Sequence, residues 1–226
     1  MTARRVVLWR HGQTSYNIAG RIQGATDIPL DEVGLRQVEA AAECLADGYP
    51  PAAIVSSDLC RAQQTAAPLA ALTGLDINLD TRLRERTFGQ WEGLSSVEIA
   101  QKWPDEFAQW RAGRDIPEIG METRKQAAER IAAAVADAAE GVGEQDTVVV
   151  VTHGGAMVCG ITRLLGLEAD TWLGLRIMGN AHWAVLEPSP QRTPAWRLAV
   201  FDQRAPGQSD QTWPPSSSAP RIRDMA

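Results

Sequence analysis

The chain has 226 residues, of which 44% are hydrophobic, and it carries a formal net charge of −6 at pH 7. This length suits one α/β domain with a sizeable core, and the acidic balance argues against a general nucleic-acid or membrane-surface binder. The longest apolar run is far shorter than a membrane span, which argues against an integral membrane protein.

The first expected element is a buried strand at residues 6–9, an apolar run of β-branched and aromatic side chains. Arg10, His11 and Gly12 follow it directly. Because neighbouring side chains on a strand point to opposite faces, Arg10 and His11 can act on one ligand only if the chain leaves the extended path here. Gly12 permits that turn and a close approach of the backbone to a ligand. Taken alone, such a pair would favour a surface loop.

A helix over residues 31–46 and a short strand over residues 53–57 come next, and a second arginine follows them. Ser57 or Asp58 is expected to cap the following helix, which ends at Gly74. This cap puts Arg61 in the first turn of the helix. A helix N-terminus attracts anions, and a guanidinium matches phosphate oxygens. A single arginine of this kind more often pairs with a surface carboxylate.

Glu85 lies between Arg84 and Arg86, a pattern that is usually a solvated charge cluster. Residues 87–121 follow it and do not fit a plain crossover helix. They hold Trp91, Trp103, Phe107 and Trp110, with Pro104 and Pro117 as breakers. Aromatic residues at such spacing are most often core. Because the segment follows Glu85 directly, we expect a helical flap that covers a pocket, excludes water and selects the substrate.

A second apolar run at residues 147–151 repeats the first pattern, since it ends at Thr152 and His153 and is followed by glycine. An alanine-rich helix over residues 122–140 precedes it, and a helix over residues 156–165 follows. In a parallel sheet, ligands collect outside the carboxyl ends of the strands. The two histidines are therefore expected to face each other there, an arrangement that packing alone explains poorly.

Closing strands are expected at residues 182–187 and 196–201. The alternation of strands and helices predicts an α/β fold, a three-layer α/β/α arrangement around a doubly wound, mostly parallel sheet. We expect one domain over residues 1–203, with the flap at 87–121. The Pro/Ser-rich tail at 204–226 has too few apolar residues to pack by itself.

Four segments of the chain resemble the histidine phosphatase superfamily, which includes the cofactor-dependent phosphoglycerate mutases. The first segment comprises residues 10–12, Asn17 and residues 21–30, and the other three are residues 56–66, residues 85–93 and residues 152–155. They appear in the family's order and cover roughly residues 5–160. The resemblance implies a phosphoglycerate mutase-like fold with one antiparallel strand in the sheet.

The resemblance also implies a mechanism. His11 would be the nucleophile that becomes a phosphohistidine, and it must be neutral to attack. Arg10, Arg61 and His153 would neutralise the phosphoryl charge, which is the main requirement of phosphoryl transfer. Glu85 would protonate the leaving oxygen and then take a proton from the attacking water.

The substrate-binding set is expected to comprise Arg10, Asn17, Gln23, Arg61, His153 and Gly154. No metal and no cofactor are expected, because the cations are side chains and the few histidines lack zinc-like spacing. The expected partner is a small phosphorylated metabolite, without nucleic acid or membrane. A homodimer is reasonable for the superfamily.

Two alternatives stay open. A cofactor-dependent phosphoglycerate mutase would need further cationic groups, but Phe88 and Ser96 stand where mutases have tyrosine and lysine, and Arg111 and Arg114 are separated rather than paired. Net hydrolysis is therefore favoured. The other alternative is a non-catalytic phosphate-binding regulatory module, which the complete catalytic set disfavours.

Within the phosphatases, residues 83–94 and 178–183 carry a further resemblance, which implies a phosphoglycerate or sugar phosphate as substrate, whereas His182 is interpreted as a strand residue unrelated to chemistry. Residues 120–122 depart from the family's usual Gly-Gly-Glu. The three cysteines are odd in number and sit in helix-like contexts, so we expect reduced, buried thiols. With Met1 leading straight into a strand and no visible signal peptide, the expected location is the cytoplasm.

Overall fold

The computed structural model describes residues 2–207, within which six strands form one mixed sheet in the order β3-β2-β4-β1-β5-β6. The strands are β1 (Arg5–Arg10), β2 (Ala53–Ser56), β3 (Ile77–Leu79), β4 (Thr147–Thr152), β5 (Trp183–Pro188) and β6 (Trp196–Gln203). Strand β5 is antiparallel to both β1 and β6, so it alone is reversed in this sheet. The predicted fold class is confirmed. Residues 208–226, most of the predicted tail, lie outside the described residues.

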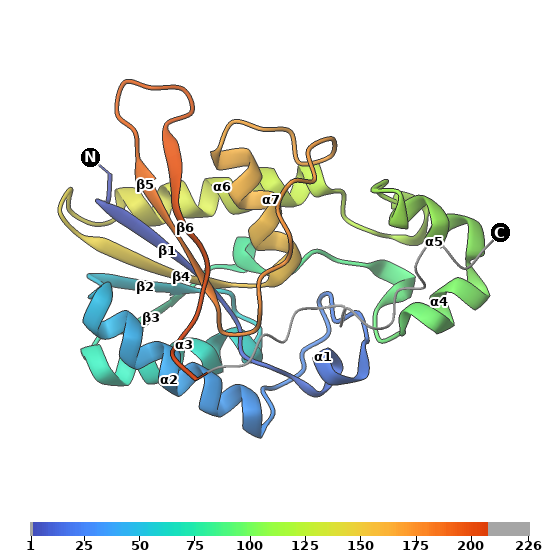
Figure 1. Cartoon of the computed structure of the whole chain (residues 1–226), viewed down its shortest axis with the longest axis horizontal. Helices are drawn as coiled ribbons and strands as arrows, with labels where there is room; N and C mark the ends of the chain where they lie inside the picture. The colour runs from blue at the N-terminus through green and yellow to red at the C-terminus, as the bar shows by residue number, and fades with distance from the viewer. Residues whose placement is uncertain (1, 208–226) are drawn as a thin grey trace.

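Helices cover both faces of the sheet (Figure 1). One layer consists of α2 (Glu32–Gly48) and α3 (Cys60–Thr73), and the other of α6 (Arg124–Glu140) and α7 (Gly154–Leu164). The short helices α1 (Ser15–Ala19), α4 (Ser96–Lys102) and α5 (Pro104–Arg111) lie apart from these layers. The 3-10 turns η2 (Gly89–Trp91) and η3 (Pro117–Ile119) lie near α4 and α5, whereas η1 (Thr81–Leu83) packs into the core under α6 through Leu83. Figure 1 shows α4 and α5 beyond the carboxyl ends of β1 and β4.

The central strands explain why the sheet is covered on both sides. All six residues of β4 are buried, as expected for a parallel strand between two helix layers. Val148 and Val150 belong to the core cluster under α6 and α7, whereas Val149 and Val151 belong to the cluster under α2 and α3. Because successive side chains of a strand point to opposite faces of the sheet, the apolar residues of β4 contribute to both cores.

Packing against α2 requires a glycine at position 12. A Cβ added there would lie 2.7 Å from the Gly34 carbonyl oxygen and 2.8 Å from Cγ1 of Val38, both on α2. The structure thus gives Gly12 a packing reason, while its approach to a bound group stays an expectation. The glycine lets the end of β1 lie directly against the start of α2.

The predicted cap of α3 is wrong. The helix starts at Cys60 after Leu59, without a side-chain cap. Asp58 instead forms a bidentate ion pair with Arg84, and Ser57 Oγ lies 2.9 Å from Nε2 of His153. Arg61 still falls in the first turn, as predicted.

The segment 87–121 forms a small layer with its own core. Trp91, Ile99, Ile116, Ile119 and Met121 are buried together, and Trp103, Phe107 and Trp110 pack against them. The segment leaves and rejoins the body at one neck, where Phe88 bridges Met121 and the Glu122 N–H donates to the Thr87 carbonyl at 2.9 Å. We keep the name flap for residues 87–121.

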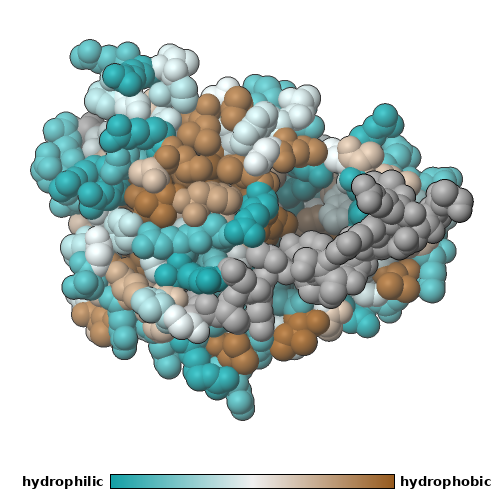
Figure 2. Space-filling view, in the orientation of Figure 1, coloured by the Kyte–Doolittle hydropathy of each residue, from teal (hydrophilic) through white to brown (hydrophobic). Residues whose placement is uncertain are grey.

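The broadest hydrophobic area in the view of Figure 2 lies over the region of β6 and α7. Partly buried apolar side chains that pack against the adjoining core include Leu175, Leu198 and Phe201. No helix between residues 2 and 207 is both long and apolar enough to cross a membrane.

Candidate active site

His11 follows β1 directly, and its main-chain N–H donates to the Thr152 carbonyl at 3.1 Å, which ties His11 to the end of β4. Its Nδ1 lies 2.7 Å from the Gly12 carbonyl oxygen. A carbonyl can only accept, so Nδ1 carries the proton in this contact. The lone pair of the neutral ring is then on Nε2, the nitrogen that is free to attack.

His153 follows β4 in the same way, and the structure brings the two rings together. Their centroids are 5.2 Å apart, with an angle of 55° between the planes. Nε of Arg61 donates to Nδ1 of His153 at 3.1 Å, so the ring proton is on Nε2, which donates to Ser57 Oγ at 2.9 Å. Both nitrogens of His153 are therefore in use and the ring is neutral.

Burial explains why the two histidines are uncharged. His11 and His153 are 3% and 0% exposed. This burial, together with the positive charges of Arg61 and Arg10, lowers the pKa of each ring well below 6.5. The candidate site therefore holds two neutral imidazole rings, and its positive charge comes from the two arginines.

Both arginines are held by main-chain carbonyls. Arg10 Nη1 donates to Met178 O, while its buried Nε has no partner within the described chain. Arg61 is fully buried, and its two Nη groups donate to Thr26 O and Gly24 O, each at 2.8 Å. Burial lowers the pKa of Arg10 to about 10 and also lowers that of Arg61. Arg10 thus remains a cation at neutral pH.

Glu85 lies at the N-terminus of α7. Its Oε1 accepts the N–H groups of Ala156 at 2.7 Å and Arg86 at 2.8 Å, and its Oε2 accepts that of Gly155 at 2.9 Å. A helix N-terminus favours such a carboxylate. A Cβ added at Gly155 would lie 2.9 Å from Oε1, so this glycine makes room for Glu85. Three of about four lone-pair directions are occupied, which leaves one for a proton in transit.

The three remaining predicted residues lie around this centre. Asn17 in α1 is linked through Asn180 to the His11 carbonyl. Gln23 precedes Gly24 on the loop that Arg61 holds, and its buried amide oxygen has no partner within residues 2–207. Gly154 begins α7, and a Cβ there would approach Nε of Arg10 to 3.0 Å.

Sequence reasoning missed the role of Asn180. Its Nδ2 lies 3.2 Å from both the His11 and the Gly12 carbonyl oxygens, and 3.1 Å from Oδ1 of Asn17. It thereby fixes the carbonyl that holds the His11 proton. The stretch 178–183 had been singled out only for its resemblance, and nothing in it indicated which side chain reaches the site. His182 instead pairs with Asp202 at 2.7 Å.

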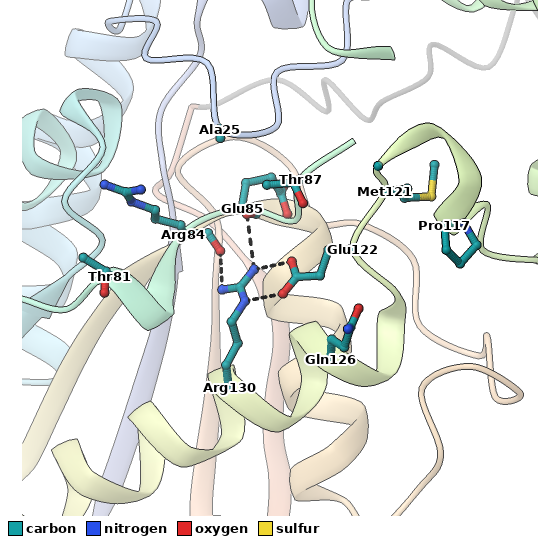
Figure 3. A pocket seen from close by; sticks show the side chains of 11 residues that line it. Ala25, Thr81, Arg84, Glu85, Thr87, Pro117, Met121, Glu122, Gln126 and Arg130 are labelled. Atoms are coloured by element: carbon teal, nitrogen blue, oxygen red, sulfur yellow. Dashed lines mark hydrogen bonds and ion pairs between the residues drawn. The ribbon is translucent and has the colours of Figure 1, made fainter. Parts of the chain in front are cut away.

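A cavity of about 650 Å³ opens beside Glu85 (Figure 3). Its lining includes Arg84, Thr87, Gln126 and Arg130, which bring charged and polar groups from the flap neck and α6. Among residues 2–207, no group of three or more His, Cys, Asp or Glu side chains is placed to hold a metal ion. The three cysteines are free, with Cys159 buried and Cys44 and Cys60 partly so.

Comparisons with known proteins agree with this geometry. The model of the histidine phosphatase superfamily, branch 1, matches residues 6–200. Glucosyl-3-phosphoglycerate phosphatase of Mycobacterium tuberculosis is 41% identical over 222 residues, covering 93% of this chain and 99% of the relative. A metal-independent phosphoserine phosphatase of Arabidopsis thaliana is 39% identical over 158 residues, covering 67% of this chain and 65% of the relative.

A solved structure of mycobacterial glucosyl-3-phosphoglycerate phosphatase in complex with VO3 superposes with a TM-score of 0.80 at 41% identity, covering 88% of this chain and 99% of that chain. The chain belongs to branch 1 of the histidine phosphatase superfamily. Within that superfamily it is an enzyme, a phosphatase.

Proposed function

We propose that this phosphatase hydrolyses the monoester of a small hydroxylated, acidic metabolite through a phosphohistidine at His11. The observation that carries the proposal is the 2.7 Å contact from His11 Nδ1 to the Gly12 carbonyl, which leaves the Nε2 lone pair free. Nε2 would attack phosphorus and form an N–P bond while the bond to the ester oxygen breaks. Arg10 and Arg61 would offset the charge of the transferring phosphoryl group.

Glu85 is the proposed proton donor and acceptor. It would give one proton to the leaving alkoxide oxygen, and in the second step it would take one proton from the water that attacks the phosphohistidine. The N–P bond then breaks, and inorganic phosphate and the free imidazole are released. General acid–base help of this kind contributes roughly 10²- to 10⁴-fold. His153 would support the binding of the phosphoryl group by positioning Arg61 through Nδ1, since its one N–H donates to Ser57 Oγ. Asn17, Gln23 and Gly154 complete the proposed binding set.

The organic part of the ester would occupy the cavity of about 650 Å³ beside Glu85. Nη1 of Arg84 has no hydrogen bond within residues 2–207, since Nε and Nη2 bind Asp58. It is thus available to a carboxylate, while Thr87 and Gln126 suit hydroxyl groups. With the 41% identical relative, this lining favours glucosyl-3-phosphoglycerate. The flap at 87–121 is proposed to close over this cavity.

The mutase and the binding module are the competing functions. Arg111 and Arg114 are exposed, and neither lines the cavity beside Glu85. A second phosphoryl position for isomerisation therefore lacks support, and hydrolysis is favoured. A panel of phosphate esters with His11→Ala as control separates the three. Phosphate release only by the native enzyme supports hydrolysis, exchange of 3- and 2-phosphoglycerate supports the mutase, and binding without turnover supports the module.

The same panel tests the metabolite and the absence of a metal. Preference for glucosyl-3-phosphoglycerate over simple sugar phosphates would support that substrate, and equal rates would remove it. A chelator is expected to leave the rate unchanged, because the proposed cations are side chains. The homodimer and the cytoplasmic location stay proposals, which sedimentation and cell fractionation test.

A further inference from the structure

Arg130 lies beside the candidate active site, where an arginine would be expected to bind phosphate. It projects from α6 into the lining of the cavity next to Glu85 (Figure 3). Its side chain is 22% exposed. The hydrogen bonds of its guanidinium argue for a different role.

All five N–H groups of Arg130 are already used by the protein. Nε and Nη2 donate to the two carboxylate oxygens of Glu122 at 2.6 and 2.7 Å, a bidentate pair. Nη1 donates to the carbonyls of Arg82 at 2.6 Å and Arg84 at 2.7 Å, and Nη2 also donates to that of Glu85 at 3.2 Å. A guanidinium has five donors and no more, so none is left for a phosphate.

These acceptors define what Arg130 holds. Three carbonyls lie within four consecutive residues that lead from η1 to Glu85, and Glu122 lies at the opposite side of the flap neck. One planar guanidinium thus binds the main chain of Glu85 and both strands of the neck to α6. Lysine offers a point charge and three rotatable donors, so it cannot reproduce this fork.

We propose that the Arg130–Glu122 pair is a positioning device that sets the place of Glu85 for proton transfer, and that Arg130 does not bind the substrate phosphate. The proposal rests on the role proposed above for Glu85. The carboxylate must stay on the N–H groups of Gly155 and Ala156 and still reach the ester oxygen, so a small shift of its main chain is costly. Misplacement by about 1 Å can cost on the order of 10²-fold in rate.

The test compares two esters that differ in their need for a proton. The leaving group of glycerol 3-phosphate is the alkoxide of glycerol, which needs the proton from Glu85. The leaving group of 2,4-dinitrophenyl phosphate is a stable phenolate, which departs without a proton. Because kcat/KM covers only the steps through departure of the leaving group, it reports the first proton transfer alone. The variants are Arg130→Lys, Glu122→Gln and Glu85→Gln.

We expect Arg130→Lys to lower kcat/KM for glycerol 3-phosphate by about 10- to 100-fold and for the dinitrophenyl ester by less than about 3-fold. Glu122→Gln should also lower the ratio of kcat/KM for glycerol 3-phosphate to kcat/KM for the dinitrophenyl ester, by a smaller factor. In the Glu85→Gln background, Arg130→Lys should add no further loss for the alkyl ester, since both changes act on one step. Equal losses on both esters, or additive losses, would overturn the proposal.

Arg197→Lys is the matched control, because Arg197 of β6 also pairs with a glutamate, Glu187 of β5, but has no contact with the segment that leads to Glu85. Its ratio of kcat/KM values should equal that of the native enzyme. If Arg130→Lys fails to fold, Glu122→Gln still reads the ratio. A native enzyme that cleaves neither ester would refute the proposed function, whereas cleavage of both with an unchanged ratio would refute only the positioning role.

Discussion

Nε of Arg61 donates to Nδ1 of His153 at 3.1 Å, which makes the second histidine of the site an acceptor of the arginine's hydrogen bond. The contact fixes the neutral tautomer of His153 and aims its other N–H at Ser57. It also orients the guanidinium, whose remaining donors hold the loop carbonyls of Gly24 and Thr26. The buried side chain of Arg61 therefore both supplies positive charge to the site and holds His153 and the neighbouring loop in place.

Arg61→Lys should therefore impair both stability and activity. A buried lysine keeps the charge but cannot serve His153, Gly24 and Thr26 together. We expect the free energy of unfolding to fall by about 2–4 kcal/mol and kcat/KM to fall by roughly 10²-fold or more. Urea denaturation and steady-state kinetics measure the two effects. Arg84→Lys, at an exposed ion pair, should change stability by less than about 1 kcal/mol, and a similar loss there would contradict this account.

Stability should fall on mild acidification. The folded-state pKa values of all three histidines lie below 6.5, chiefly because burial disfavours the charged ring. Below pH 6.5 the unfolded chain binds protons that the folded chain does not, so the free energy of unfolding decreases as pH falls toward 5. Each histidine contributes a slope of up to about 1.4 kcal/mol per pH unit.

Urea denaturation in phosphate-free buffer between pH 7 and 5 measures this slope. His11→Gln removes one of the titrating groups and should make the dependence shallower by up to one histidine's share. An unchanged slope in that variant would show that His11 is not held neutral by the fold. The carboxylates with lowered pKa values, such as Asp58 and Asp80, titrate below about pH 4 and leave this window clear.

Gly155→Ala should act on Glu85 specifically. The added methyl group would lie 2.9 Å from Oε1 and push the carboxylate away from the N-terminus of α7. We expect kcat/KM for an alkyl phosphate to fall by about 10-fold or more, with a loss of stability of roughly 1–2 kcal/mol. Gly48→Ala, where a Cβ would have nothing within 4 Å, is the control and should leave the kinetics unchanged. Native activity in the Gly155 variant would mean that Glu85 works without these contacts.

Asn180→Asp should disturb the proposed nucleophile, His11, through the carbonyl groups that hold it. A carboxylate there would face the carbonyl oxygens of His11 and Gly12 with no N–H to offer them. The Gly12 carbonyl would lose the support that keeps it on Nδ1 of His11. We expect kcat to fall by roughly 10-fold or more, because leaving buried acceptors unpaired costs about 1–3 kcal/mol. Asn78→Asp, at an exposed site in β3, should have no such effect on rates measured in parallel.

Much of the fold could be predicted because local patterns and tertiary structure agree in it. Apolar runs ending in histidine marked β1 and β4, and helical spacing marked α2, α6 and α7 with errors of one or two residues at their ends. β3 was missed because it has three residues, two of them exposed. α1 was missed because it has five residues and none is buried, so no hydrophobic periodicity marks it.

The placement of Arg10, His11, Arg61 and His153 could also be predicted, since these four residues stand at the ends of expected elements, whereas only the family resemblance singled out Glu85. The contacts that hold the centre of the site in place could not be predicted. Ser57 and Asp58 have the right chemistry for a helix cap, but His153 and Arg84, far along the chain, bind them instead. Arg130 acts on main-chain carbonyls, which every residue carries, so no side-chain pattern points to its targets.

The flap begins and ends at one place, the bridge between Phe88 and Met121. Inside the flap, Ser95 also bridges Arg21, and the Gly93 N–H donates to the Ile22 carbonyl at 2.8 Å, next to the loop that Arg61 holds. Exposed residues of α4 and α5 away from these ties are the positions where an exchange disturbs the body least. We expect a change of preferred ester to be tolerated there while the reacting side chains keep their positions.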